Sequence, residues 1–463
     1  MAVMGKTKSV LTLVGRVINE AVSFIVFSLL DLFDFLLCYV YKLADFFMEA
    51  EWKPCYCSSG KEAITSSGKI LVSEQGKSKI VCLSSSKLQL EEISDTLYTR
   101  PSLVSEVSNL TVTELKRLKV TDRTINVQSC EKIKNGTVRS TFTANSTIVE
   151  MLQGKIGKQQ LHPIPRWSDC DCKLCISWTS SCKETLFVRA EGPKAFWTET
   201  LFPNFSSAAK STYRLFAIDL LGFGRSPKPT DSLYTLREHL DMIEQSVLEP
   251  YKTKSLHIVA HSLGCILALA LAVKHPGCVK SLTLLAPPYY PVPKGTQATQ
   301  YVMRRVAPRR VWPLIAFGAS IACWYEHISR TICLLICKNH RLWEFLTKLV
   351  TRNRIRTFLL EGFFLHTHNA AWHTLHNIIC GTASKLDAYM DAVRDHLKCD
   401  VAVFHGQDDE LIPVECSHNV KARIPRARVK VIEKKDHITI VVGRQKSFAR
   451  ELEEIWRNSS TRN

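Results

Sequence analysis

The sequence lacks the compositional bias of disordered, collagen-like or multi-span membrane proteins, since 46% of its residues are hydrophobic, 9% aromatic and 22% charged. It is also poor in acidic residues: 43 Asp and Glu stand against 61 Lys and Arg, a formal net charge of +18. This excess favours anionic lipid, nucleic acid or a pectin-like polysaccharide as partners. Because no recognisable nucleic-acid-binding module is present, we expect no nucleic-acid partner.

The chain of 463 residues is long enough for two or three domains of roughly 100 to 200 residues each. Its 17 cysteines are too few for a disulfide mini-scaffold but many for a cytosolic protein, which favours an oxidising compartment. Four cysteines lie close together at Cys170, Cys172, Cys175 and Cys182. They could bind zinc, but the C-x-C-x2-C spacing lacks the paired C-x2-C units of the usual zinc modules. The sequence therefore predicts disulfides here, with no metal and no cofactor.

The N-terminal 50 residues have the pattern of a targeting segment. Residues 1–16 are basic with no acid, and residues 21–41 are almost wholly apolar apart from Asp31 and Asp34. The pattern predicts a signal peptide or a signal anchor. Each carboxylate would cost about 2.5 to 3.5 kcal/mol in a membrane-spanning helix, which indicates a poor or tilted span. The alternative is an amphipathic helix lying on a membrane or on the protein itself.

Two weaker signals also concern the compartment. Cys38 follows Phe-Leu-Leu in a loosely lipobox-like context and is a candidate lipidation site. Five Asn-x-Ser/Thr sequons fit a secreted glycoprotein: Asn109, Asn135, Asn145, Asn204 and Asn458. We expect the chain to enter the secretory pathway and some of these asparagines to carry glycans.

The composition changes along the chain and predicts further segments. Residues 51–166 are rich in Ser, Thr and Lys, have few apolar runs and show no repeat, which predicts a poorly structured region. Beyond it, short apolar runs alternate with helical patterns, which predicts an α/β fold with a mostly parallel sheet and helices on both faces. These runs are Tyr213–Asp219, Leu256–Ala260, Val279–Leu285, Val401–Phe404 and Val429–Ile432. The predicted core has two parts, 167–288 and 382–463, separated by an insertion at 289–381.

A nucleophile motif follows the second of these runs. Val-Ala-His-Ser-Leu-Gly precedes a helical pattern, which is the strand-turn-helix setting of a nucleophile elbow with Ser262 at its tip. The positions flanking the serine must be small because the turn is tight. At the helix N-terminus, the backbone N–H of Leu263 can stabilise an oxyanion. The other elbow residues are Ala260, His261 and Gly264.

A serine hydroxyl needs a base and an orienting carboxylate, which in this motif follow in the order Ser, acid, His. The loop after the strand at 401–404 fits G-x-x-D-x-x-hydrophobic-P and selects Asp409 over its neighbour Asp408. After the next strand, His437 is placed to act as the general base. Packing or pocket-lining roles are expected for the histidines of the insertion: His366, His368, His373 and His376.

Several motifs together resemble one known family. They are Trp167–Cys172, Ala195–Asn204, Asp219–Ser226, Ala260–Gly264 and Asp436–Gly443. With them the chain from about 167 to 456 resembles the BODYGUARD family of plant α/β hydrolases. The resemblance implies an α/β-hydrolase fold with a helical cap at 289–381, and a triad of Ser262, Asp409 and His437. It also implies an extracellular, cell-wall-associated lysophospholipase or lipid esterase that helps form cutin in the epidermis.

One departure from the hydrolase pattern stands out. A hairpin strand such as Thr185–Ala190 is normally followed by an apolar strand that ends in His-Gly, whose loop supplies the second oxyanion N–H. Here Glu191–Lys194 runs straight into Ala195, where the next helix already begins. The alternative, that Thr185–Ala190 is itself this strand, fits poorly because it contains Arg189 and no His-Gly. The sequence predicts a full triad, one missing central strand and an incomplete oxyanion hole.

These observations favour a serine hydrolase acting on lipid or cutin-type esters, associated with a membrane or the cell wall. An acyltransferase or polyester synthase could use the same triad. The alternative from another class is a non-catalytic scaffold. Such a protein would have lost its catalytic activity together with the oxyanion loop.

Overall fold

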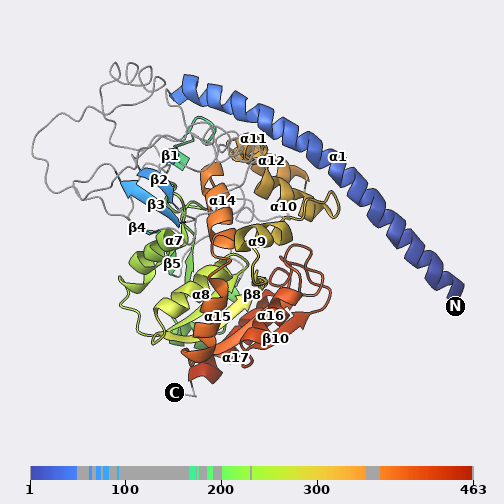
Figure 1. The fold of residues 1–463 in the computed structure, drawn as a ribbon. Coiled ribbons are helices and arrows are strands. Elements are labelled where there is room, and N and C mark those ends of the chain that lie inside the picture. Colours follow the sequence, from blue (N-terminus) through green and yellow to red (C-terminus); the bar gives the residue numbers. More distant parts are fainter. Residues whose placement is uncertain are drawn as a thin grey trace, which may run out of the picture.

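The computed structural model describes residues 2–49, 62–64, 69–74, 77–82, 91–92, 166–170, 172–173, 175–176, 185–190, 201–229, 232–350 and 365–460. A parallel sheet flanked by helices forms the lower part of the view in Figure 1, and further helices lie above it. The long helix α1 runs along the side of these upper helices, and its N-terminal end projects away from the rest of the chain.

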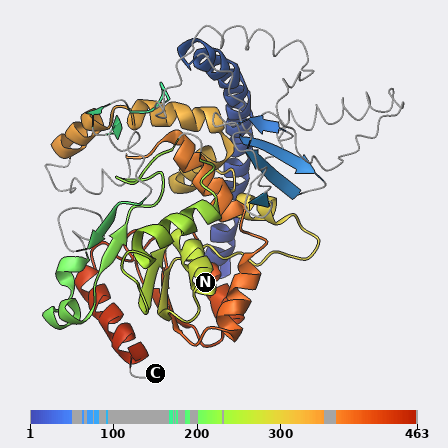
Figure 2. The ribbon, with the colours of Figure 1, turned by 90° about the vertical axis from the view of Figure 1, so that its left-hand side faces the viewer.

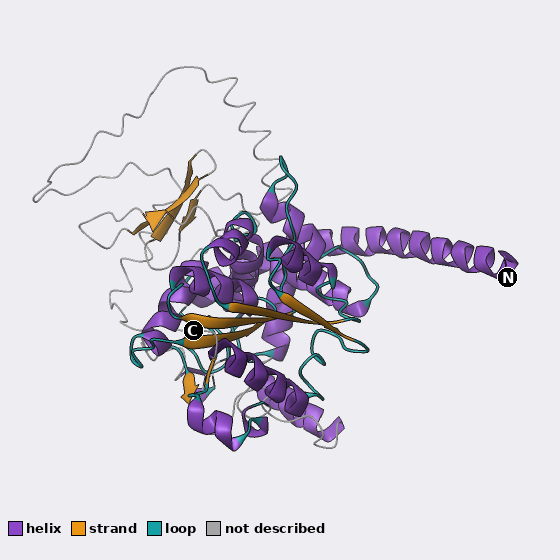
Figure 3. Ribbon diagram, turned by 90° about the horizontal axis from the view of Figure 1, so that it is seen from below, coloured by secondary structure: helices purple, strands orange, loops and turns teal. Residues whose placement is uncertain are grey.

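The central sheet is parallel and has the strand order β10-β9-β8-β7. Helices cover both of its faces (Figure 3), which explains why the strands read as nearly continuous apolar runs. Its strands are β7 (Leu256–His261), β8 (Val279–Leu285), β9 (Asp400–Gly406) and β10 (Arg428–Ile432). Each contains a run that the sequence predicted as a strand, and the predicted α/β fold class is confirmed.

A separate antiparallel pair lies beside this sheet. β5 (Val188–Ala190) pairs with β6 (Phe216–Ile218), and among the described strands β6 and β7 are not hydrogen-bonded to each other. All residues of β6 and β7 are only half-buried, whereas six of the seven residues in each of β8 and β9 are buried. In an α/β-hydrolase sheet, one further strand would lie between β6 and β7. This is the strand that the sequence predicts to be missing. Residues 191–200, where that prediction falls, lie outside the described residues.

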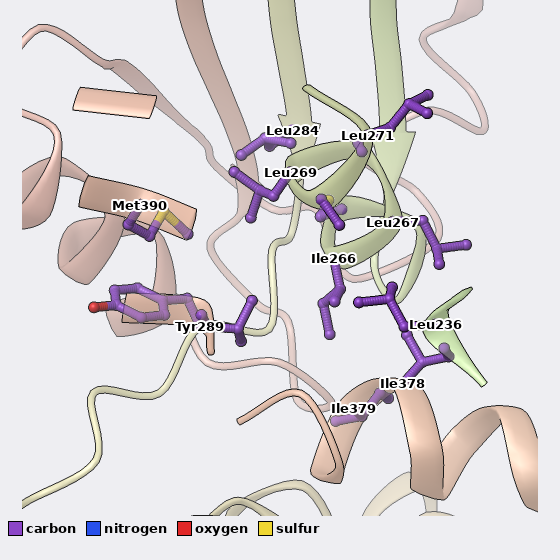
Figure 4. Close-up of a cluster of buried hydrophobic side chains, with 14 of the residues drawn as sticks. Leu236, Ile266, Leu267, Leu269, Leu271, Leu284, Tyr289, Ile378, Ile379 and Met390 are labelled. Atoms are coloured by element: carbon purple, nitrogen blue, oxygen red, sulfur yellow. The ribbon is translucent and has the colours of Figure 1, made fainter. Parts of the chain in front are cut away.

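One face of the sheet packs on α8 (Gly264–Lys274), which follows the elbow directly. Eight consecutive residues of α8, from Cys265 to Ala272, are buried. They contact Leu284 of β8 and residues of the neighbouring helices, including Ile378 and Met390 (Figure 4). These helices are α7 (Leu236–Ile243), η3 (Leu375–Cys380) and α15 (Leu386–Asp395). Since each fully buried Leu or Ile contributes about 1.5 to 3 kcal/mol, the packing holds the elbow helix firmly in place.

The opposite face packs on α17 (Gln445–Ser460) near the C-terminus. Phe448 stands edge-on to Phe404 of β9, and Trp456 stacks on Phe205. The smaller helices η1 (Phe202–Asn204) and α6 (Ser207–Thr212) lie in the same layer, and α16 (Glu415–Arg423) connects β9 to β10.

The insertion predicted at 289–381 is helical throughout its described elements. Its helices are α9 (Ala298–Val306), α10 (Leu314–Trp324), α11 (Glu326–Ile336), α12 (His340–Val350) and α14 (His368–Thr374), continued by η3. We call α9 to α14 the cap. The cap lies between the sheet and the C-terminal half of α1 (Figures 1 and 2).

Helix α1 (Ala2–Glu49) contains a stretch, Val14–Met48, that is long and apolar enough to cross a membrane, which is compatible with a signal sequence or an anchor. Its carboxylates bind the cap. Asp34 is buried and accepts the backbone N–H groups of His327 and Ile328, each at 2.9 Å. These N–H groups lie in the first turn of α11, where a helix leaves its donors without partners.

Two further carboxylates of α1 pair with cap arginines. Asp31 contacts Arg309 at 2.6 Å in a half-exposed ion pair, and Asp45 forms a buried, bidentate pair with Arg330 at 2.7 Å for both bonds. The acidic residues that appeared to weaken a membrane span therefore join α1 to the cap. These contacts correspond to the alternative in which the helix lies on the protein itself.

Four short strands lie within the stretch 51–166. β1 (Glu62–Ile64), β2 (Lys69–Glu74), β3 (Lys77–Cys82) and β4 (Glu91–Glu92) form an antiparallel sheet. For these strand residues the structure differs from the predicted lack of regular structure.

Candidate active site

Ser262 lies in the turn between β7 and α8 with a backbone φ of 53°. This left-handed conformation is unfavourable for a residue other than glycine and persists only where the surroundings enforce it. Here the Ser262 N–H donates to the carbonyl of Leu285 at the end of β8, at 2.8 Å. The strained turn at the start of a buried helix is the geometry that a nucleophile elbow requires.

The two small positions of the elbow face each other. A Cβ added at Gly264 would lie 3.8 Å from the Cβ of Ala260, an ordinary van der Waals contact. Alanine therefore fits at position 260, as the sequence predicted, while a larger side chain at either position would meet the other.

Asp409 and His437 form a buried hydrogen-bonded pair. His437 Nδ1 lies 2.7 Å from Asp409 Oδ2. The other carboxylate oxygen, Oδ1, accepts the backbone N–H groups of Leu411 and Ile412 at 3.0 and 2.8 Å. Asp408, by contrast, is exposed. The structure thus brings Asp409, and not its neighbour, to the histidine.

A second histidine, which the sequence reasoning did not single out, also supports the acid. His405, the penultimate residue of β9, is fully buried, and its Nε2 lies 3.4 Å from Asp409 Oδ2. Burial alone would raise the pKa of Asp409, but hydrogen bonds from His405 and His437 outweigh it and hold that pKa well below its usual range. The carboxylate is therefore charged and able to orient His437. The only sequence signal for His405 is its position four residues before the acid.

His261 connects the elbow to the base. Its Nε2 donates to the carbonyl oxygen of His437 at 2.9 Å, and the two rings lie 4.6 Å apart. Burial lowers the pKa of His261 to about 4, so the imidazole is neutral at physiological pH. The described residues include no hydrogen bond between Ser262 and His437, and such contacts are often longer before substrate binds.

The elbow offers one oxyanion donor. The N–H of Leu263 precedes α8 and donates no hydrogen bond to any of the described residues. The loop that would carry the second donor falls within residues 191–200, outside the described residues.

The glycine turn Asp219–Ser226 contacts both the core and the cap. Gly224 has a φ of +53°, and a Cβ there would meet the Asp219 carboxylate at 2.4 Å, so only glycine fits. The neighbouring Phe223 forms an isolated β-bridge with His366 of the cap. Of the other insertion histidines, His373 and His376 are buried in packing positions, as predicted.

The predicted cysteine sites differ from the structure. Cys170, Cys172 and Cys175 are all free thiols, so the prediction of disulfides is wrong for these three, and Cys182 lies outside the described residues. Cys38, the candidate lipidation site, is buried and hydrogen-bonded to His327. Acylation of Cys38 would require α1 to leave the cap.

Comparison with known proteins supports the class that this geometry defines. A family model described as "alpha/beta hydrolase fold" matches residues 191–443, more than half of the chain. "Probable lysophospholipase BODYGUARD 3" of Arabidopsis thaliana is 61% identical, with 99% of this chain and 100% of that protein covered. "Probable lysophospholipase BODYGUARD 1" of the same plant is 57% identical, with 96% and 98% covered.

The site and the matched core make the protein a hydrolase of the α/β-hydrolase class. Within that class, the chain belongs to the BODYGUARD family, as its sequence motifs predicted. The alignment with BODYGUARD 3 spans 499 positions against the 463 residues of this chain, so at least 36 positions of the relative have no counterpart here.

Proposed function

We propose that the protein hydrolyses lipid esters through Ser262, Asp409 and His437. In this mechanism His437 takes the proton of the Ser262 hydroxyl, and Asp409 orients the imidazole and stabilises its charged form. Ser262 attacks the ester carbonyl and expels the alcohol, and water then releases the acid from the acyl-enzyme. The Leu263 N–H binds the oxyanion in both steps.

The buried 2.7 Å contact between Asp409 and His437 carries this proposal. It fixes the proton of His437 on Nδ1 and leaves Nε2 free to act as a base toward Ser262. The relatives named probable lysophospholipases support an acyl ester as the substrate class.

Apolar surface on the cap and on α1 supports a lipid substrate at a membrane or cell-wall surface. Large apolar side chains are exposed on α10, α12 and the segment before α10, where soluble proteins usually avoid them. They include Trp312, Leu314, Leu342, Phe345 and Leu349, and α1 adds Phe24, Ile25 and Leu29. We propose that the chain enters the secretory pathway and acts on cutin-type or related lipid esters of the epidermal cell wall.

The catalytic proposal is tested with a fluorophosphonate probe, which labels only an activated serine. We expect the full-length protein in detergent to be labelled, and Ser262→Ala and His437→Ala to abolish labelling. Ser211→Ala, at an exposed serine of α6, is the matched control and should label as the parent does. Labelling that persists in Ser262→Ala would contradict the proposal.

A catalytically impaired scaffold is the second candidate. The gap between β6 and β7, which no described strand bridges, favours it, because the second oxyanion donor belongs to the strand that would lie between them. Loss of one donor reduces the rate by about 10² to 10³-fold. A folded protein that shows no probe labelling, in which Ser262→Ala changes nothing, would support the scaffold over the enzyme.

A further inference from the structure

Cysteines and histidines gather at the junction between the segment 166–176 and the cap. We call Cys170, Cys172, Cys175 and His340 the first cluster; one potential ligand atom from each lies within 4.8 Å of all the others. The three cysteines precede the family-model match at residues 191–443, while His340 begins α12. Their sulfur atoms are free thiols rather than disulfides.

Three thiols and one imidazole are the ligand set of a closed structural zinc site. A tetrahedral zinc with Zn–S bonds of about 2.3 Å places its sulfur ligands about 3.8 Å apart. The cluster would therefore contract by no more than about 1 Å to bind the ion. Cys172 and Cys175 have the C-x2-C spacing of zinc ligands, and His340, far away in the sequence, supplies a ligand that the local motif lacks.

A hydrogen bond already orients the imidazole of His340. Its Nδ1 lies 3.0 Å from the carbonyl oxygen of Cys337, which can only accept, so Nδ1 carries the proton. This leaves the lone pair of Nε2 available to a metal. Metal-binding histidines usually donate their other ring N–H in this way, which fixes the tautomer and the ring orientation.

A second cluster consists of Cys333, Cys337 and His366. The Nε2 atom of His366 lies 3.6 Å from each of the two sulfur atoms. A tetrahedral zinc with a Zn–S bond of 2.3 Å and a Zn–N bond of 2.0 to 2.1 Å separates S and N by about 3.6 Å, the same value. His368, which is hydrogen-bonded to Cys333, is a candidate fourth ligand.

We propose that Cys170, Cys172, Cys175 and His340 bind a structural zinc ion, and that Cys333, Cys337 and His366 bind a second one beside it. Thiolate and imidazole ligands in tetrahedral arrangement select zinc over the harder divalent cations. The first ion joins the segment 166–176 to α12.

The second ion joins α11 to the turn before α14, whose His366 bridges to Phe223 of the core. Hydrogen bonds also connect the segment 166–176 to the cap. Lys338 Nζ donates to the Trp167 carbonyl at 2.7 Å, and Arg330 Nε donates to Ser168 Oγ at 3.1 Å. Both ions would therefore stabilise the cap and its junctions. Neither would take part in the proposed hydrolysis at Ser262.

Metal content of the full-length protein, purified in detergent without chelator, tests the proposal. We expect two zinc ions per chain, and one in each of Cys172→Ser, Cys337→Ser and His340→Ala. His340→Cys keeps a fourth ligand and should keep two. Cys278→Ser removes a half-buried thiol outside both clusters and should also keep two. Fewer than two ions in the parent, or two in the ligand variants, would overturn the assignment.

Because ligand variants can fail to fold, a second experiment uses the unaltered chain. N-ethylmaleimide followed by mass spectrometry should leave the five cluster cysteines unmodified until a chelator is added, while Cys278 reacts equally with or without chelator. The chelator should also lower the thermal midpoint. Disulfides among Cys170, Cys172 and Cys175, or modification independent of the chelator, would overturn the proposal.

Discussion

The strands inside the parallel sheet and the strands at the split between the two sheets differ in burial. β8 and β9 lie inside the parallel sheet and are buried almost throughout, whereas β6 and β7 are half-buried along their whole length. β7 leads to Ser262 and β9 leads to Asp409, so among the described strands the nucleophile follows an edge strand, whereas the acid follows an interior strand. The difference teaches that Asp409 and His437 can be brought together even though no described strand pairs with the outer side of β7.

The largest expected effect concerns the acid that follows the interior strand β9. Asp409→Asn removes the charge that orients His437 and should lower the rate of probe labelling by about 10⁴-fold, the loss seen when a triad acid is neutralised. Asp408→Asn alters an exposed neighbour and should change the rate little. Labelling rates of the two variants are compared side by side. Equal losses would remove the basis for assigning Asp409 as the acid.

The next effect concerns β7, the edge strand among the described strands of the parallel sheet. Inserting roughly 15 to 25 residues between Lys194 and Ala195, enough for one apolar strand ending in His-Gly and its loops, should place a strand between β6 and β7 that pairs with both. Hydrolysis of a p-nitrophenyl ester should rise by about 10² to 10³-fold through the second oxyanion donor. The thermal midpoint should rise as well, since each unpaired buried backbone group costs about 1 to 3 kcal/mol.

The present chain, without the inserted strand, is the direct control for the repaired chain that carries it. The relatives' additional positions, at least 36 for BODYGUARD 3, are compatible with a lost segment of this kind. If the present chain melts cooperatively and hydrolyses the ester as fast as the repaired one, Thr185–Ala190 already serves as the strand that we consider missing.

A smaller effect concerns the contact between the acid and base loops. A Cβ at Gly406 would lie 2.4 Å from the carbonyl oxygen of Lys435 and 2.7 Å from that of Asp436. Gly406→Ala should therefore displace the loop that carries His437, and a shift of about 1 Å can cost about 10²-fold in rate. Gly277→Ala, where a Cβ meets nothing within 4 Å, is the matched control. Unchanged ester hydrolysis in Gly406→Ala would show that the base loop tolerates the displacement.

The smallest effect on catalysis is expected at α1, on the far side of the cap. Asp34→Ala leaves two buried N–H groups of α11 without their acceptor and should lower stability by about 1 to 3 kcal/mol. Asp31→Ala breaks a half-exposed ion pair and should cost at most about 1 kcal/mol. Chemical unfolding measures both, and probe labelling should hardly change in either. A loss of stability in Asp31→Ala larger than that in Asp34→Ala would contradict the ranking of these two contacts between α1 and the cap.

The sequence by itself determined the features that depend on local pattern. The strand runs, the elbow around Ser262 and the loop motif of Asp409 each occupy a few consecutive residues, so their spacing identified them. The break at Lys194 and Ala195 rests on the same kind of pattern and stays a prediction, because residues 191–200 lie outside the described residues.

Only the tertiary structure decided the features whose partners lie far apart in the chain. From the sequence, Asp34 is a charged residue that makes a membrane-spanning helix less favourable. The fold instead places it against the first turn of α11, 293 residues away. Cys170, Cys172 and Cys175 suggested disulfides until folding brought His340 beside them and left them as free thiols. A carboxylate or thiol is stabilised by whichever donors, charges or ligands surround it in space, and packing brings these groups together from distant parts of the sequence.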